Sequence, residues 1–348
     1  RTAAAAAAAR IFWVGMEPPR ISPYDRARRV VPHALRFHSM RIWVPSQAAA
    51  DVLADLPEVE CVVFDGTTPP PEGAEKVEVF IPPLSPSYDV PALFAKMTSL
   101  RLVQTVSAGV EPYLPHLPEG VTLCNARGVH DAGTAEWAVG AMLAMLRDFP
   151  RFADRQRKGI WDYHYTDALA DSTVLIIGYG SIGQALERRL APFEVNVIRV
   201  ARTARQGPDG RVVHGQDELP GLLPLADVVV LLVPQTPDTR RMVDAGFLAR
   251  MKDGAVLVNA ARGSVVDTDA LLDELSAGRL RAALDVTDPE PLPPNHPLWT
   301  MPNCLITPHV GNTPEMARPL LAERIRTNVR RFAEGEELIG TVDVDAGY

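Results

Sequence analysis

Three residues in the C-terminal part of the chain have side chains suited to acid–base and carboxylate chemistry: Arg262, Glu290 and His309. An arginine presents a planar fork of donors, which can bind a carboxylate and polarise a neighbouring keto oxygen. A histidine exchanges a proton near neutral pH, as the alkoxide formed by hydride transfer to a ketone requires. A glutamate beside the imidazole would orient the ring and raise its pKa, because an opposite charge favours the charged form.

Each of the three also has an ordinary structural interpretation. Arg262 fits a surface ion pair, His309 fits a position near a helix cap, and Glu290, between two prolines, fits a loop. All three, however, follow apolar runs that we predict to be strands of one parallel sheet. Ligands of such sheets bind beyond the carboxyl ends of the strands. The shared position therefore favours the hypothesis that they form a catalytic set.

A glycine motif precedes these residues. It follows the apolar run 173–177 and opens a stretch with apolar residues at helical spacing, and it reads Gly178-Tyr179-Gly180-Ser181-Ile182-Gly183. The first glycine permits a tight turn, the second lets the backbone approach a pyrophosphate, and the third lets helix and strand pack closely. The free N–H groups at the start of the helix would hold the phosphates. A plain strand–turn–helix is the alternative, but the context favours dinucleotide binding.

Short apolar runs alternate with helical patterns from residue 41 onward, which predicts parallel sheets covered by helices. We expect an α/β fold with two doubly wound parallel-sheet domains, a Rossmann cofactor domain inserted into a flavodoxin-like substrate domain. Residues 40–131 and 314–348 would form the substrate domain and residues 132–313 the dinucleotide-binding domain. Strands are predicted at 41–44, 60–64, 76–81, 102–106, 121–124, 173–177, 196–200, 227–233, 255–259, 282–285 and 304–306, and helices at 47–56, 92–97, 132–146, 182–190, 245–251, 267–276 and 314–333.

Composition restricts the class of protein. The chain has 348 residues, of which 47% are hydrophobic and 22% charged, as in a globular protein with a substantial core. The formal net charge of −8 argues against a nucleic-acid partner, and no apolar run is long enough for a membrane span. Three widely spaced cysteines lack metal-ligand spacing and fit a reducing compartment, so we expect a cytoplasmic protein with no bound metal.

Residues 1–39 differ from the rest, with seven arginines against one aspartate and one glutamate. We interpret them as an N-terminal extension, with the enzyme proper beginning near Met40. A transit peptide is the alternative, because the segment is rich in arginine and poor in acidic residues.

These motifs resemble those of the D-isomer-specific 2-hydroxyacid dehydrogenase family over about residues 41–335. The resemblance implies that Arg262 binds substrate, that His309 is the acid/base paired with Glu290, and that Asp285 holds the nicotinamide carboxamide. It further implies that the substrate carboxylate binds to a turn of small residues, Ser107-Ala108-Gly109. One departure is visible: many members have two glycines soon after the histidine, whereas this chain has Val310-Gly311 in a loop one residue shorter.

The nicotinamide cofactor is predicted from the end of the second strand of the glycine-motif domain. NAD-binding folds place an acidic residue there, about 20 positions after the glycine turn, but this chain has Ala201. Arg202, Thr203 and Arg205 follow, which suits the 2′-phosphate of NADP(H), with NAD(H) as the alternative. The other cofactor contacts that we assign are Val233, Pro234, Thr239, Ala260, Ala261, Asp285 and Gly311, with Arg262 and His309 shared between cofactor and substrate.

The leading functional hypothesis is an oxidoreductase that transfers a hydride between NAD(P)H and a small 2-keto or 2-hydroxy acid such as glyoxylate or hydroxypyruvate. A phosphite or formate dehydrogenase is one alternative, although the related formate enzymes carry glutamine where this chain has Glu290. A nicotinamide-sensing co-repressor on the same fold is another. The apolar stretch 132–146 favours a homodimer, and the aromatic residues Trp161, Tyr163 and Tyr165 would lie in an interface or near a substrate cleft.

Overall fold

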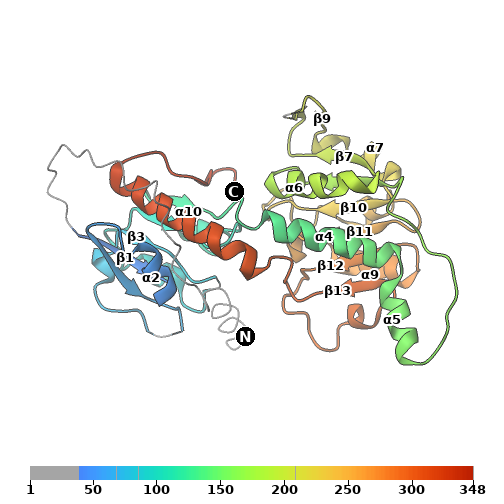
Figure 1. Ribbon diagram of the computed structural model, residues 1–348, viewed down its shortest axis with the longest axis horizontal. Helices are drawn as coiled ribbons and strands as arrows, with labels where there is room; N and C mark the ends of the chain where they lie inside the picture. The colour runs from blue at the N-terminus through green and yellow to red at the C-terminus, as the bar shows by residue number, and fades with distance from the viewer. Residues whose placement is uncertain (1–38, 68, 85, 208, 348) are drawn as a thin grey trace. The chain divides into compact units, whose positions relative to one another are not determined.

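The structure is a computed structural model that describes residues 39–347 except residues 68, 85 and 208. The described chain divides into two compact units, one made of residues up to Val129 and from Pro314 onward, the other of His130–Thr313 (Figure 1). Apart from Ser39, the expected extension at 1–39 lies outside the described residues. The domain boundaries given above stay a prediction about independently folding parts.

A five-stranded parallel sheet in the order β2-β1-β3-β4-β5 is the centre of the first unit. Residues from α2 and α10 share a core with β1 on one face, whereas residues from α3 share a core with β1 and β3 on the other. The strand order is that of doubly wound, flavodoxin-like sheets. The elements are β1 (Met40–Val44), α2 (Gln47–Leu53), β2 (Val59–Val63), β3 (Val79–Phe80), α3 (Val90–Phe94), β4 (Leu102–Gln104), β5 (Thr122–Cys124) and α10 (Pro314–Glu334).

The second unit contains a six-stranded parallel sheet in the order β13-β12-β11-β10-β6-β7. Its strand order reverses direction between β6 and β10, the switch point at which such sheets bind ligands. The strands are β6 (Thr173–Ile177), β7 (Asn196–Val200), β10 (Val228–Leu231), β11 (Val256–Asn259), β12 (Arg281–Leu284) and β13 (Cys304–Ile306), with an antiparallel ribbon of β8 (Arg205–Gln206) and β9 (Val212–Val213). The helices are α4 (Asp131–Leu146), α5 (Phe149–Arg157), α6 (Ser181–Leu190), α7 (Leu219–Leu222), α8 (Ala245–Leu248) and α9 (Thr268–Ser276).

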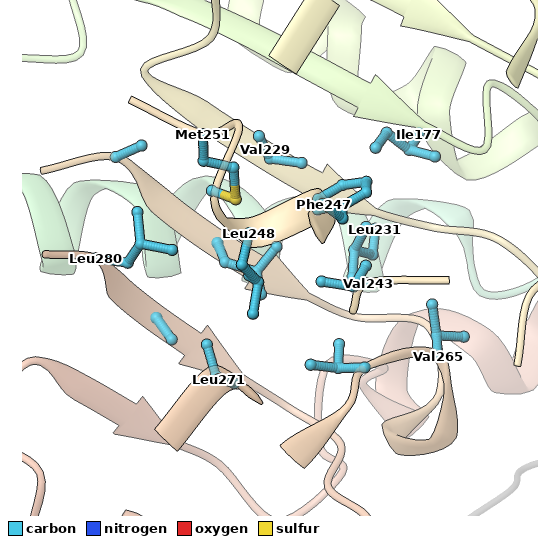
Figure 2. Packing of buried hydrophobic residues seen from close by; sticks show 14 of the residues in the cluster. Ile177, Val229, Leu231, Val243, Phe247, Leu248, Met251, Val265, Leu271 and Leu280 are labelled. Atoms are coloured by element: carbon cyan, nitrogen blue, oxygen red, sulfur yellow. The ribbon is translucent and has the colours of Figure 1, made fainter. Parts of the chain in front are cut away.

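Helices cover both faces of this second sheet, because its strands carry apolar side chains on both sides. Along β6, Val174 and Ile176 pack with residues of α4 and α6, whereas Leu175 and Ile177 face the other core. Figure 2 shows part of that other core, in which strand residues meet residues in and around α8 and α9: Ile177, Val229, Leu231, Phe247, Leu248, Met251 and Leu271. Burial on both faces leaves only the strand ends accessible, which is where a parallel sheet carries its loops.

The carboxyl ends of these strands lie in one row across the sheet. The register pairs Ile177 with Leu231, Leu231 with Asn259, Asn259 with Leu284, and Leu284 with Ile306. Each loop that leaves this edge therefore starts beside the next one. The glycine motif, Arg262, Asp285 and His309 all follow directly from this row.

Most predicted elements are present, with ends shifted by a few residues. The predicted strand at 76–81 is present as β3 but is limited to Val79 and Phe80, because Ala74–Lys76 forms a 3-10 turn. The predicted helix at 245–251 ends at Leu248. The apolar character of the stretch 132–146 is explained by α4 packing on α6, β11 and β12 within its own unit, so it is not in itself a reason to expect a dimer.

Candidate active site

The glycine motif forms a tight turn at the switch point. Gly178 has φ of +102°, and a Cβ there would lie 2.5 Å from the carbonyl carbon of Leu232, so only glycine fits. A Cβ on Gly183 would lie 2.9 Å from the Gly178 carbonyl oxygen. The absence of a side chain at Gly183 therefore allows α6 to pack closely on the turn. Gly180 precedes α6, and no described side chain caps this helix end. Its backbone N–H groups are suited to hold a phosphate.

Arg262 is placed by the loop after β11. The side chain of Asn259, at the end of that strand, accepts a hydrogen bond from the N–H of Ala261 (3.0 Å) and donates one to the carbonyl of Arg262 (3.0 Å). The Arg262 guanidinium donates to the Ala261 carbonyl (2.8 Å). A Cβ on Gly263 would lie only 2.0 Å from the Thr287 carbonyl oxygen, so the loops after β11 and β12 are pressed together.

Glu290 and His309 form a hydrogen-bonded pair. His309 Nδ1 donates to Glu290 Oε1 at 2.7 Å, and both side chains are about half exposed. The Glu290 carboxylate raises the pKa of His309 above its usual value, opposed by partial burial and by the positive charge of Arg262. The imidazole therefore retains its proton to higher pH than an isolated histidine, with Arg262 near enough for its charge to act on the ring.

Asp285 organises the loop that carries His309. This buried carboxylate accepts hydrogen bonds from Thr307 Oγ1 (2.6 Å) and the N–H of Val310 (2.8 Å) on Oδ1, and from the N–H of Gly311 (2.8 Å) on Oδ2. The N–H of His309 donates to the Asp285 backbone carbonyl (2.8 Å). His309 has φ of +57°, a left-handed conformation uncommon for a non-glycine residue, which these bonds hold in place.

The carboxamide role that the resemblance implies for Asp285 is compatible with this arrangement. A carboxylate has about four acceptor positions, and the described loop occupies three of them. The sequence did not indicate the loop-organising role, because two of the donors are backbone N–H groups about 25 residues away. The only indication in the sequence was the position of Asp285 at the end of a predicted strand, beside the loop that leaves the next strand of the sheet.

The segment predicted to bind the adenosine ribose follows β7. Val200 ends the strand as predicted, and the buried Ala201 occupies the position of the acidic residue of NAD-binding folds. Arg202 and Thr203 are exposed. Arg205 Nη2 donates to the carbonyl of Tyr179 in the glycine turn (2.8 Å), which brings two predicted cofactor segments together.

The remaining predicted cofactor residues lie in the loops of the same edge. Val233 follows β10, and its N–H nitrogen would lie 2.7 Å from a Cβ on Gly178. Thr239 Oγ1 donates to the Pro234 carbonyl (2.7 Å) and so shapes that loop. Ala260 N–H donates to the carbonyl of Leu231 (3.3 Å).

The predicted carboxylate-binding turn, Ser107-Ala108-Gly109, belongs to the first unit, whereas Arg262, Glu290 and His309 belong to the second. Its carbonyl groups accept hydrogen bonds within its own unit, from Thr105 Oγ1 to Ser107 (2.8 Å), from Asn125 to Ala108 (3.2 Å) and from Ser107 Oγ to Gly109 (2.7 Å). Within the described part of the chain, the N–H groups of these three residues make no hydrogen bond. The turn is thus equipped to bind an anion.

Other site types find no support in the described ranges. Residues 39–347, outside the three gaps, contain no group of three His, Cys, Asp or Glu side chains arranged to hold a metal ion. No helix among these residues is sufficiently long and apolar to cross a membrane. Cys61, Cys124 and Cys304 are not paired in disulfides.

The chain is similar to proteins of one family. The family model "D-isomer specific 2-hydroxyacid dehydrogenase, NAD binding domain" matches residues 139–311. The human glyoxylate reductase/hydroxypyruvate reductase is 32% identical over 322 residues, which cover 86% of this chain and 96% of the human protein. The mouse enzyme of the same name is 35% identical over 270 residues, covering 73% of this chain and 80% of the mouse protein.

Solved structures of proteins from the same family superpose on this chain. A D-isomer specific 2-hydroxyacid dehydrogenase from Xanthobacter autotrophicus Py2, in complex with NADPH and MES, superposes with a TM-score of 0.79 at 31% identity and covers 90% of this chain and 100% of its own. An NADPH-dependent glyoxylate/hydroxypyruvate reductase from Sinorhizobium meliloti, in complex with NADP and sulfate, gives a TM-score of 0.78 at 28% identity, with 89% and 100% covered. The chain therefore belongs to the D-isomer specific 2-hydroxyacid dehydrogenase family, whose members are NAD(P)-dependent oxidoreductases.

Proposed function

We propose that this enzyme reduces a small 2-keto acid, glyoxylate or hydroxypyruvate, with NADPH as the hydride donor. The observation that carries the proposal is the row of strand ends, from which the glycine turn, Arg262 and the Glu290–His309 pair all leave the same edge of one sheet. The human and mouse relatives named for these two substrates support the substrate class.

The residues divide the chemistry between them. The Arg262 guanidinium is suited to bind the substrate carboxylate and to polarise the keto oxygen. When bound at the glycine turn, the nicotinamide cofactor would supply the hydride for the keto carbon. His309 gives its proton to the oxygen as charge develops there, and Glu290 holds the ring in orientation and favours the charged form.

Arg202, Thr203 and Arg205 support a preference for the phosphorylated cofactor, because two guanidinium groups and a hydroxyl fit a phosphate dianion. The Sinorhizobium relative, described as NADPH-dependent, supports the same preference. NADH remains the weaker alternative.

A panel of 2-keto acids, assayed with NADPH and with NADH, tests the proposal directly. We expect turnover of glyoxylate or hydroxypyruvate with a higher kcat/KM for NADPH, and an Arg202→Ala variant that loses most of that preference. Absence of turnover with every keto acid would favour the nicotinamide-sensing alternative. A higher kcat/KM for NADH, or an Arg202→Ala variant with unchanged preference, would refute the assignment of the cofactor.

We also propose a homodimer with the segment 160–166 at its interface. The aromatic side chains of this segment are largely exposed: Trp161 by 93%, Tyr163 by 74% and Tyr165 by 90%. Exposure of so much aromatic surface to water is unfavourable, which favours its burial against another protein surface. The intervening Asp162 and His164 fix the segment, through Arg151 (2.8 Å) and Asp148 (2.9 Å). Sedimentation analysis should give a dimer that Trp161→Ser weakens. A monomeric wild type would contradict this proposal.

The cytoplasmic location stays a prediction.

A further inference from the structure

A buried arginine lies on the edge strand β7, next to the predicted cofactor segments. Arg199 is part of β7, and its side chain is only 4% exposed. Removing a guanidinium from water is unfavourable unless it is fully paired. Neither the glycine motif nor the predicted phosphate-binding residues accounts for a charge at this position.

Arg199 is paired with two carboxylates at once. Its Nε donates to Glu187 Oε2 (2.8 Å) and its Nη2 also contacts the Oε1 of Glu187, a residue of α6. On the other side, Nη1 and Nη2 donate to Asp209 Oδ1 (2.9 Å) and Oδ2 (2.8 Å). Asp209 lies in the turn between β8 and β9, so the arginine joins α6, β7 and the ribbon. The exposed Arg211 lies farther from both carboxylates, at 3.8 and 3.7 Å.

The same group of residues holds the glycine turn. The Tyr179 ring lies beside the Arg199 guanidinium, 5.1 Å from its central carbon to the ring centroid, and the Tyr179 hydroxyl donates to Glu187. Burial and the neighbouring Glu187 raise the pKa of Tyr179 to about 12, so the hydroxyl stays protonated as a donor. The carbonyl of Tyr179 accepts from Arg205 (2.8 Å).

We propose that Tyr179, Glu187, Arg199 and Asp209 form a positioning cluster that sets cofactor selectivity, by holding residues 201–207 against the glycine turn. This inference rests on the proposed preference for NADPH. The segment starts at the end of β7 and is tied again at Asp209, and it carries Arg202, Thr203 and Arg205 between these two points. A segment fixed at both ends keeps its guanidinium groups oriented before the cofactor arrives, so less conformational entropy is lost on binding a 2′-phosphate.

Asp209→Asn separates positioning from simple electrostatics. The Asp209 side chain is 47% exposed and Arg199 retains Glu187, so the variant leaves no unpaired buried charge. If charge alone mattered, removal of an anion near a phosphate site would lower the KM for NADPH. If Asp209 holds the segment, the KM for NADPH should rise, by about tenfold, because weakened charge-assisted hydrogen bonds each contribute about that factor. NADH lacks the 2′-phosphate, so its KM and the kcat should change by less than about twofold.

The experiment measures KM and kcat for both cofactors in the wild type, Asp209→Asn, Asp209→Glu and a control, Asp253→Asn. Asp253 also pairs with an arginine, Arg279 (3.3 Å), but it precedes β11 at the opposite end of the strands. We expect Asp209→Glu to restore the KM for NADPH in part and Asp253→Asn to leave it unchanged. Thermal unfolding of each variant without cofactor shows that it is folded.

The outcomes distinguish this inference from the proposed function. A wild type that uses NADH with the higher kcat/KM overturns both the cofactor assignment and the cluster's role. A wild type that prefers NADPH, with an Asp209→Asn variant of unchanged or lower KM for NADPH, overturns the cluster's role and leaves the proposed function intact. Equal increases in KM for both cofactors would show a general loss of structure and overturn the inference as well.

Discussion

Replacing Asp285 by asparagine should slow the reaction by disturbing the loop that carries His309. The carboxylate accepts three hydrogen bonds, two on Oδ1 and one on Oδ2. Asparagine can keep the bonds to Oδ1 with its amide oxygen, but its NH2 group then faces the N–H of Gly311, which is also a donor. One hydrogen bond to a charged acceptor is lost, which costs about 1.5–3 kcal/mol.

That loss acts on a strained backbone. His309 keeps φ of +57° only while the surrounding hydrogen bonds favour it over relaxed conformations. About 1.4 kcal/mol corresponds to a factor of ten. The lost hydrogen bond should therefore lower the population of the catalytic orientation of His309 by about ten- to a hundredfold. We expect kcat to fall by about tenfold or more.

The assay is the pH dependence of keto-acid reduction. The charge of Asp285 also raises the pKa of His309, so the variants must be compared on the plateau at low pH, where His309 is protonated in all of them. Thr307→Val is the matched control: it removes one donor to Oδ1 and leaves the carboxylate charged, so its kcat should fall less. A plateau kcat of Asp285→Asn equal to that of the wild type would refute the reasoning.

Three further outcomes are expected at the proposed catalytic residues. His309→Ala should lower kcat by about 100- to 10,000-fold, because the forming alkoxide lacks a proton donor; stopped-flow rates near wild type would exclude His309 as the acid. Glu290 raises the pKa of His309, so Glu290→Gln should move the alkaline fall in kcat/KM for reduction to lower pH; an unmoved limb would contradict that pairing. Arg262→Lys should raise the keto-acid KM and lower kcat, since one ammonium cannot replace the planar fork; unchanged steady-state kinetics would remove Arg262 from the site.

The sequence predicted the strands that carry the candidate site well, because buried parallel strands have a characteristic apolar pattern. The bounds of β6, β7 and β13 are those predicted. The strands β6 and β13 are apolar or β-branched runs followed by glycine or by Thr307-Pro308, whereas β7 is recognisable from its three β-branched residues. Once the strands are placed, the rule that ligands bind beyond their carboxyl ends locates Arg262 and His309 without further information. The residues of the Glu290–His309 pair were predicted in the same way, although their 2.7 Å contact depends on two loops that periodicity does not describe.

Elements with little buried surface were missed. Helix α5 has no buried residue and begins with Phe149-Pro150, so its pattern does not stand out from a loop. The ribbon of β8 and β9 has two residues in each strand, and only Val213 among them is buried. Arg205 belongs to this ribbon, so its bond to the glycine turn could not be anticipated from spacing alone.

Buried polar residues that hold the loops of the candidate site are harder to predict from the sequence than the reactive residues themselves. In the second unit, Thr236, Thr239, Asn259 and Asp285 are all buried at or just beyond the carboxyl ends of strands. Each would destabilise the fold if left without a partner, and each instead bonds to loop backbone or a neighbouring side chain at the same edge. Their hydrogen bonds convert flexible loops into fixed positions for groups such as His309. A reactive residue is recognisable by its chemical type, whereas a supporting residue is defined by partners that only the folded chain brings within reach.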